Sequence, residues 1–135
     1  MSDEPETPRD RLRLILGDEG LRRLDEATVL VIGLGGVGSS CAEALARGGV
    51  GGLVLLDRDV VTPSNINRQA LAFHSTVGRG KADVMREMVL DINPEARVTA
   101  VRAFLPKDGL ADALDALPRP DYVVDAIDTL AQKLG

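Results

Sequence analysis

A cluster of polar side chains stands in the stretch SNINRQA, which holds Asn65, Asn67, Arg68 and Gln69. An arginine guanidinium binds phosphate or carboxylate oxygens through two parallel hydrogen bonds, and amide side chains donate hydrogen bonds to the same oxygens. Lys81, further along the chain, adds a second cation. These residue types in this order predict a site that binds the phosphate groups of a ligand.

A glycine-rich loop precedes this stretch. Gly33, Gly35 and Gly38 match the pattern G-x-G-x-x-G, with Gly36 as an additional glycine. Residues without a Cβ atom permit a tight turn and let backbone N–H groups approach a phosphate at the N-terminus of the following helix. Asp57 lies downstream, at the distance expected of an acid that accepts hydrogen bonds from ribose hydroxyl groups. The pattern therefore predicts nucleotide binding.

Further carboxylates bear on which nucleotide would bind. Asp59, Asp125 and Asp128 are available to hold magnesium, which in nucleotide sites takes one or two carboxylates together with phosphate oxygens. Two cations and a metal ion around a single mononucleotide favour ATP. NAD is the alternative, because the glycine pattern is also the dinucleotide fingerprint. A dinucleotide fold requires two mononucleotide-binding halves, however, and the sequence shows only four predicted strands.

Alternating strands and helices must position these residues. Continuous apolar runs predict buried strands at 28–32 and 53–57. A third strand is expected at 97–102, less apolar and so nearer an edge, and a fourth at 122–127. Helical patterns lie between the strands at 39–49, at 80–92 and around Leu110, Leu114 and Leu117. A helical pattern at 9–26 precedes the first strand, and another begins at 128, after the last strand. The alternation predicts an α/β fold, a Rossmann-like parallel sheet with helices on both faces. Short N-terminal helices, divided at Gly17 and Gly20, come before it.

The predicted sheet explains why the polar residues should meet. Parallel α/β sheets bind ligands beyond the carboxyl ends of their strands. The glycine loop follows the first strand, Asp57 and the asparagine–arginine cluster follow the second, and Asp125 and Asp128 lie at the end of the fourth. We therefore expect a single site at this edge.

Composition limits the classes of protein that fit. Residues 1–8 are acidic and predicted to be disordered, and residues 9–135 fit one domain. The net charge of −5 and the near absence of aromatic residues argue against a surface that grips nucleic acid by itself. No apolar run approaches the ~20 residues of a membrane span, and the N-terminus does not resemble a secretory signal. A single cysteine, Cys41, excludes an internal disulfide, so a cytoplasmic protein is expected.

The motifs GLGGVG, DRDVVTPSNINRQ, INPEARV and DYVVDAID occur in an order and spacing that resemble the ThiF/MoeB/HesA-type adenylating enzymes, ancestors of the ubiquitin-activating enzymes. The resemblance runs from about residue 11 to residue 133. Within the family, the chain is most similar to the branch that dehydrates threonylcarbamoyladenosine in tRNA. Relatives continue well past the last residues of this chain, so the resemblance implies a C-terminal truncation that could leave the chain inactive.

The resemblance implies an activity and roles for the residues. Members of the family bind Mg-ATP and adenylate a carboxylate, releasing pyrophosphate. The glycine loop and the acid matching Asp57 hold the adenosine, the residues matching Asn67, Arg68 and Lys81 contact the phosphates, and the acid matching Asp128 binds magnesium or the phosphates. In the dehydratase branch the carboxylate belongs to the threonyl group on a modified adenosine of tRNA. The alternatives are the C-terminal glycine of a sulfur-carrier protein, or an ATP-binding and dimerisation module without turnover.

The resemblance also implies a homodimer. Members carry an arginine in the N-terminal helix that crosses a dimer interface to reach the partner's ATP, and Arg11 and Arg13 bracket this position, with Arg13 as the candidate. The alternative is that both arginines belong to an exposed basic face. His74 and Cys41 are interpreted as a loop or packing residue and a small buried residue, respectively.

Overall fold

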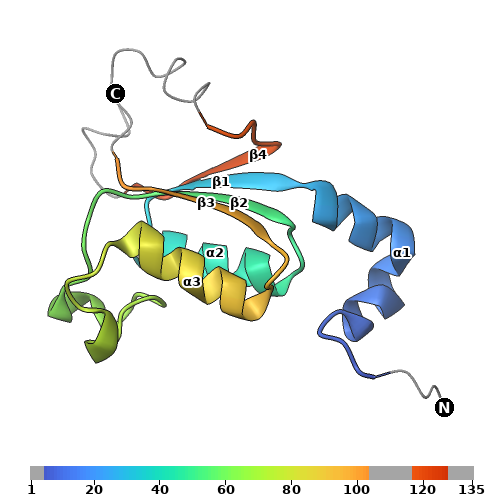
Figure 1. The fold of residues 1–135 in the computed structure, drawn as a ribbon, viewed down its shortest axis with the longest axis horizontal. Helices are drawn as coiled ribbons and strands as arrows, with labels where there is room; N and C mark the ends of the chain where they lie inside the picture. Colours follow the sequence, from blue (N-terminus) through green and yellow to red (C-terminus); the bar gives the residue numbers. More distant parts are fainter. Residues whose placement is uncertain (1–4, 104–116, 128–135) are drawn as a thin grey trace.

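Four parallel strands form a single sheet in the computed structural model, which describes residues 5–103 and 117–127. The sheet consists of β1 (Thr28–Ile32), β2 (Gly52–Leu56), β3 (Arg97–Val101) and β4 (Tyr122–Asp125), and its strand order is β3-β2-β1-β4 (Figure 1). The predicted parallel α/β fold is confirmed, and so is the edge position of β3. The predicted strands end one or two residues later than the observed β2, β3 and β4.

The register brings the carboxyl ends of the strands together. Ile32 in β1 lies opposite Leu56 in β2 on one side and Asp125 in β4 on the other. Leu56 in turn lies opposite Val101 at the end of β3. Segments that follow these residues therefore emerge at one edge of the sheet, as the sequence predicted.

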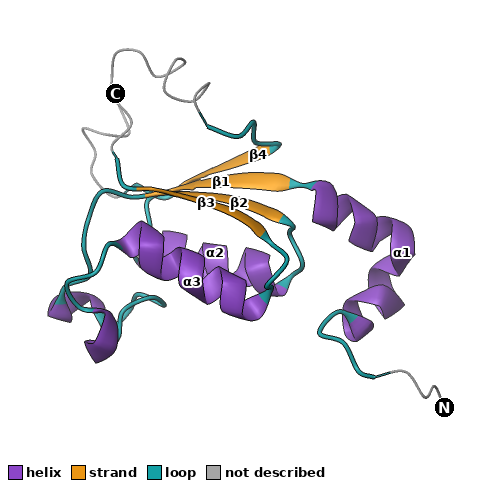
Figure 2. Cartoon of the chain, in the orientation of Figure 1, coloured by secondary structure: helices purple, strands orange, loops and turns teal. Residues whose placement is uncertain are grey.

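Two helices cover one face of the sheet. They are α2 (Gly36–Arg47) and α3 (Lys81–Ile92), and both lie on the same side of the strands (Figure 2). Because successive side chains of a strand point to opposite faces, the central strands supply two cores. The core under α2 and α3 contains residues from both strands and both helices, among them Val31, Leu55, Ala42 and Met85.

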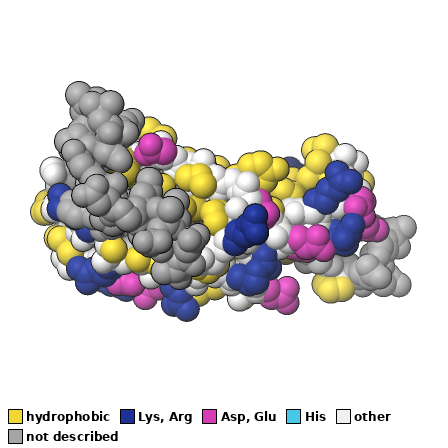
Figure 3. All heavy atoms as spheres, turned by 90° about the horizontal axis from the view of Figure 1, so that it is seen from above, with side chains coloured by type: hydrophobic (Ala, Val, Ile, Leu, Met, Phe, Trp, Pro, Cys, Tyr) yellow, Lys and Arg dark blue, Asp and Glu magenta, His cyan; other side chains and the backbone are white. Residues whose placement is uncertain are grey.

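The opposite face of the sheet carries a smaller apolar cluster, formed by Leu30, Ile32, Val54 and Leu56, with Leu117 packed against it. Apolar side chains are visible on this face in the space-filling view (Figure 3). Helices are also predicted around 110–117 and from 128, but apart from Leu117 these segments fall outside the described residues.

The N-terminal helix α1 (Asp10–Glu26) stands beyond the amino ends of the strands (Figure 1). It contains the predicted break at Gly17, whose φ of 69° and ψ of 176° are not helical. The second predicted break, at Gly20, is wrong, because Gly20 continues the helix. Of the residues predicted to be disordered, 1–4 lie outside the described part, and Thr7 donates two hydrogen bonds to the Asp10 carboxylate. Among the described residues, no helix is both long and apolar enough to cross a membrane.

Candidate nucleotide-binding site

The glycine loop makes a turn that only glycine can adopt at its two ends. Gly33 has a φ of 91°, in the left-handed region. A Cβ atom on Gly38 would stand 1.7 Å from the carbonyl oxygen of Gly33, so the backbone at Gly38 packs directly against Gly33 and leaves no space for a side chain. Helix α2 starts directly in this turn, earlier than the predicted 39, and no side chain caps its N-terminus. Its first-turn N–H groups are therefore available to an anion.

Asp57 is fixed against the glycine loop. One carboxylate oxygen accepts a hydrogen bond from the backbone N–H of Leu34 at 2.7 Å, and the other accepts one from the N–H of Asp59, also at 2.7 Å. The side chain is half-buried. Each oxygen of an ionised carboxylate keeps a second lone pair, so Asp57 can still accept hydrogen bonds from a ribose. The position next to the glycine loop fits the role that the sequence predicted.

The segment after β2 returns to its starting point before α3 begins. Val60 and Gly80 form an antiparallel bridge, the N–H of Val61 donates to Arg79 O at 2.9 Å, and the N–H of Lys81 donates to Asp59 O at 3.0 Å. Lys81, the first residue of α3, is thereby brought beside the end of β2 and Asp57. A sequence pattern cannot reveal this closure, because the closure depends on the pairing of segments about twenty residues apart.

Lys81 is a cation in an unusual environment. The residue is 7% exposed, and no described residue offers its ammonium group a hydrogen bond or an ion pair. Its ammonium nitrogen is not one of the completely buried, unpartnered polar atoms among the described residues, so the aliphatic stem is buried while the charged tip keeps access to solvent. An anionic ligand would supply the partner that no described residue provides.

Arg68 lies over the start of α2. Its Cγ and its carbonyl oxygen are each 3.8 Å from the point where a Cβ atom of Gly36 would be, so the arginine packs at contact distance against this residue. Its Nη1 donates to Ser64 O and to the side-chain oxygen of Asn67, both at 3.0 Å. The side chain is otherwise exposed, and these neutral acceptors leave the charge of the guanidinium, with Nε and Nη2, available to a ligand.

The other amides of the SNINRQA stretch differ in what they do. Asn65 is buried and its side-chain oxygen accepts the N–H of Thr62 at 2.9 Å, so it shapes the loop. Asn67 is exposed and supports Arg68. Gln69 is buried, and its Oε1 has no hydrogen-bond partner among the described residues. Direct contact of these three amides with a phosphate remains a prediction.

The predicted metal ligands are only partly within the described structure. Asp59 and Asp125 are exposed, and Asp125 closes a local turn by accepting the N–H of Ile127 at 3.2 Å. Asp128, the predicted metal ligand, lies outside the described residues. Within residues 5–103 and 117–127, no group of three His, Cys, Asp or Glu side chains could hold a metal ion. Magnesium in a nucleotide site needs fewer protein ligands than that, so its prediction stands untested.

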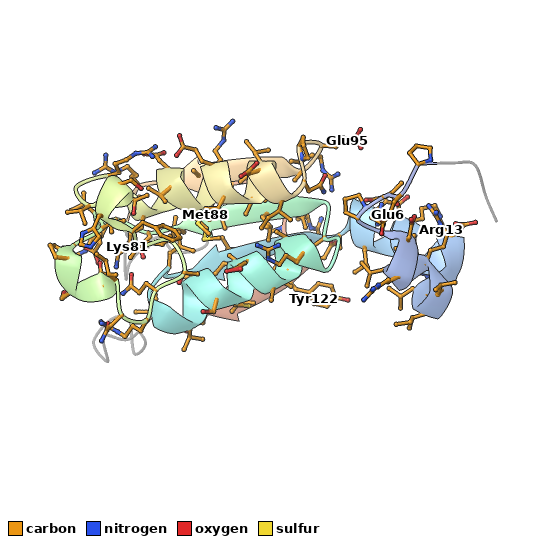
Figure 4. All side chains as sticks on the ribbon, turned by 90° about the horizontal axis from the view of Figure 1, so that it is seen from below. Glu6, Arg13, Lys81, Met88, Glu95 and Tyr122 are labelled. Atoms are coloured by element: carbon orange, nitrogen blue, oxygen red, sulfur yellow. The ribbon has the colours of Figure 1, made fainter. Side chains whose placement is uncertain are left out.

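Arg13 lies at the opposite end of the folded molecule from this site. Figure 4 shows Arg13 on α1 at one end and Lys81 at the other. Its guanidinium contacts Asp18 at 3.1 Å. Arg11 is exposed on the same helix. Neither arginine can reach the glycine loop of its own chain, so the predicted role of Arg13 requires a second copy of the protein.

Ser39 belongs to the site but was not indicated by the sequence patterns. It is fully buried in α2 and hydrogen-bonded to both the glycine loop and the segment after Arg68. The only hint in the sequence is a hydroxyl on a helix whose other buried positions, Ala42 and Ala46 among them, are small and apolar.

The sequence and the fold are similar to those of known proteins. The profile of the ThiF family matches residues 9–134. The tRNA threonylcarbamoyladenosine dehydratase of Bacillus subtilis is 47% identical over 124 residues, which are 92% of this chain and 48% of that protein. The Sulfur carrier protein ThiS adenylyltransferase of Escherichia coli is 38% identical over 115 residues, or 85% of this chain and 45% of that protein.

A solved structure shares the fold. The crystal structure of the E. coli tRNA N6-threonylcarbamoyladenosine dehydratase in complex with ATP has a TM-score of 0.81 and 40% sequence identity, and the match covers 93% of this chain and 54% of that one. The chain thus spans about half the length of the relatives that it matches.

Proposed function

Because this chain belongs to the ThiF family, we propose that it binds ATP at the carboxyl edge of its sheet and transfers AMP to a carboxylate. The observation that carries this proposal is the convergence of three segments. Asp57 is bonded to the glycine loop, Arg68 lies on Gly36 of that loop, and the backbone of Lys81 is bonded to Asp59. A ribose acceptor, two cations and a helix N-terminus thus surround one position, and the ATP complex of the E. coli relative supports the assignment of the ligand.

The chemistry needs positioning more than proton transfer. A substrate carboxylate with a pKa of about 4 is already ionised at neutral pH. Its oxygen attacks the α-phosphorus, a new carboxylate–phosphorus bond forms, the α–β anhydride bond breaks, and pyrophosphate leaves. The protein must align the two reactants and neutralise the charge that develops on the departing pyrophosphate. Arg68 and Lys81 suit that task, while Asp57 holds the ribose.

Magnesium fits the donor chemistry of this edge. Asp128 would hold it, with Asp59 and Asp125 as further carboxylates, and phosphate oxygens would complete its coordination. When bound, the ion would neutralise part of the phosphate charge.

We propose that the activated carboxylate belongs to threonylcarbamoyladenosine in tRNA. The adenylated carboxyl group is then attacked from within the same modified nucleoside, a ring closes, AMP leaves, and the net change is the loss of one water. The identity to the Bacillus subtilis dehydratase over most of this chain supports this substrate. A tRNA substrate in turn implies a cytoplasmic protein.

The experiment combines the protein, Mg-ATP and tRNA from a strain that lacks the ring-closed nucleoside. Mass spectrometry of the digested tRNA should show the modified adenosine lighter by one water. An unchanged nucleoside would contradict the substrate. Pyrophosphate release would then be measured with a sulfur-carrier protein ending in glycine, the second candidate, which the similarity to the ThiS adenylyltransferase favours. ATP binding without pyrophosphate release from either substrate would indicate a binding module, and tight NAD binding without ATP binding would contradict the proposal altogether.

We further propose that two copies of the chain form a homodimer through α1. Leu14 and Ile15 are 88% and 80% exposed on this helix, beside Arg13. Exposed apolar side chains grouped on a helix are typical of a protein interface. A second copy is the occupant that would also bring Arg13 to a nucleotide, because the arginine cannot reach its own site.

Mixing two inactive variants tests this arrangement. Arg13→Ala and Arg68→Ala should each lack activity, yet a mixture should regain it, because a mixed dimer contains one site with both arginines intact. A monomer in analytical ultracentrifugation, or a mixture as inactive as its components, would contradict the dimer.

A further inference from the structure

Ser39 makes two hydrogen bonds from a fully buried position. Its hydroxyl donates to the carbonyl oxygen of Gly35 at 2.6 Å, and its oxygen accepts the backbone N–H of Ala70 at 3.1 Å. The side chain is 0% exposed. The first bond is local to the glycine loop, whereas the second joins segments that are 31 residues apart in sequence.

The residue that Ser39 holds comes directly after the turn that carries Arg68. In that turn, the N–H groups of Arg68 and Gln69 both donate to Asn65 O, at 3.2 and 2.9 Å. The next N–H, that of Ala70, leaves the turn and donates to Ser39 instead. The hydroxyl of Ser39 therefore fixes the end of the turn relative to α2.

No other side-chain hydrogen bond between the described residues links α2 or its glycine loop to the segment from Thr62 to Thr76. The neighbouring Gln69 does not supply a second link, because its buried Oε1 has no partner among the described residues. Apart from packing contacts, the placement of Arg68 over the start of α2 thus depends on the hydroxyl of Ser39.

We propose that Ser39 is a positioning residue, which acts on the triphosphate through Arg68 and touches neither ATP nor the acceptor. The inference rests on the proposed function, since it assigns Arg68 to the phosphates. Without the hydroxyl, the N–H of Ala70 loses its partner, and the turn is free to shift so that this group can reach water. The guanidinium would shift with the turn, while the glycine loop and Asp57 would stay in place.

A purely local role makes a different prediction. A serine that only bonds back to the carbonyl four residues earlier is a common feature of helices, and its loss affects the helix and nothing else. Such a role would change ATP and adenosine binding alike or not at all. A role through Arg68 would change ATP binding alone, because adenosine has no phosphates.

The experiment measures the affinity of the protein for ATP and for adenosine by isothermal titration calorimetry. Ser39→Ala should weaken ATP binding about tenfold, which corresponds to the loss of one hydrogen bond, and should leave adenosine binding unchanged. Ser40→Ala is the matched control, because Ser40 is the exposed neighbour on the same helix and should alter neither affinity. Ser39→Cys keeps the shape of the side chain, with a somewhat larger sulfur atom that forms weaker hydrogen bonds, so it should weaken ATP binding without disturbing the fold.

A double-mutant cycle shows whether the effect passes through Arg68. In an Arg68→Ala background, Ser39→Ala should cause no further loss of ATP affinity. Additive losses, an equal loss of adenosine binding, or a Ser39→Cys variant that binds ATP like the parent would overturn the inference. Failure of the parent protein to bind ATP would instead refute the proposed function, so the two failures are distinguishable.

Discussion

Replacing Gly38 by alanine should disrupt the glycine loop. The added Cβ atom would stand 1.7 Å from the carbonyl oxygen of Gly33 and 2.7 Å from its carbonyl carbon, and both atoms belong to the backbone. No rotation of a side chain can relieve that clash, so the loop must move by more than an ångström. Overpacking of a buried position costs about 1–3 kcal/mol or more, and this clash belongs at the upper end. Alanine regains up to about 1 kcal/mol through its helix propensity.

The net expectation is a loss of about 2 kcal/mol of folding free energy together with the loss of measurable ATP binding. Urea unfolding followed by circular dichroism measures the first quantity, and calorimetry with ATP measures the second. Gly36→Ala is the control, since its Cβ atom would meet only Arg68, at 3.8 Å, and should keep the free energy of unfolding within about 0.5 kcal/mol. The explanation fails if Gly38→Ala is as stable as the parent, or if Gly36→Ala is destabilised to the same degree.

Three further substitutions separate binding from folding. Arg68→Ala should abolish pyrophosphate release with an unchanged circular dichroism spectrum, because the side chain is exposed and bonded to neutral acceptors only; normal turnover would disprove its role. Lys81→Met should weaken ATP binding by at least tenfold and leave the free energy of unfolding unchanged, because no described residue bonds to the ammonium group that is removed and methionine keeps an apolar side chain of similar length; a clear loss of stability would contradict this view of Lys81. Asp57→Asn should lower the free energy of unfolding by about 1–2 kcal/mol and should also weaken adenosine binding, because the single oxygen of the amide can replace only one of the two carboxylate oxygens that accept backbone hydrogen bonds. Unchanged unfolding curves would argue against this role of Asp57.

The strands and the shared edge could be predicted because they follow from simple physical patterns. The runs VLVI and LVLL are apolar at every position, as required of strands that are buried on both faces. Parallel strands necessarily place their carboxyl ends together, so the convergence of the glycine loop, Asp57 and Asp125 needed no knowledge of side-chain contacts. The strained turn at Gly33 and Gly38 was indicated by the glycine pattern itself.

Other features depend on tertiary pairing, which leaves no periodic pattern in the sequence. The closure that brings Lys81 to Asp59 is made by backbone hydrogen bonds, which any residue type except proline could form. The role of Ser39 depends on a bond to a backbone N–H, and nothing in the identity of Ala70 reveals it. The break predicted at Gly20 was wrong because a glycine weakens a helix without preventing it, and the backbone conformation of Gly20 is set by the chain around it.

The distribution of ion pairs explains how a protein with a net charge of −5 can offer a site to an anion. On α1, Arg22 lies within 2.6 Å of Glu19 and 3.1 Å of Glu26, and Arg13 lies 3.1 Å from Asp18, so their charges are largely neutralised by near neighbours. Arg68, in contrast, bonds only to neutral oxygens, and Lys81 has no described partner. Since Coulomb attraction falls with distance and is screened within about 8 Å at physiological salt, an anion at the glycine loop responds to the groups at this edge rather than to the overall charge. These groups are the two cations and the N-terminus of α2, opposed by the carboxylates of Asp57 and Asp59, which the proposed ribose and metal ion would engage. The local arrangement of charge, and not the composition, would therefore decide where the proposed nucleotide binds.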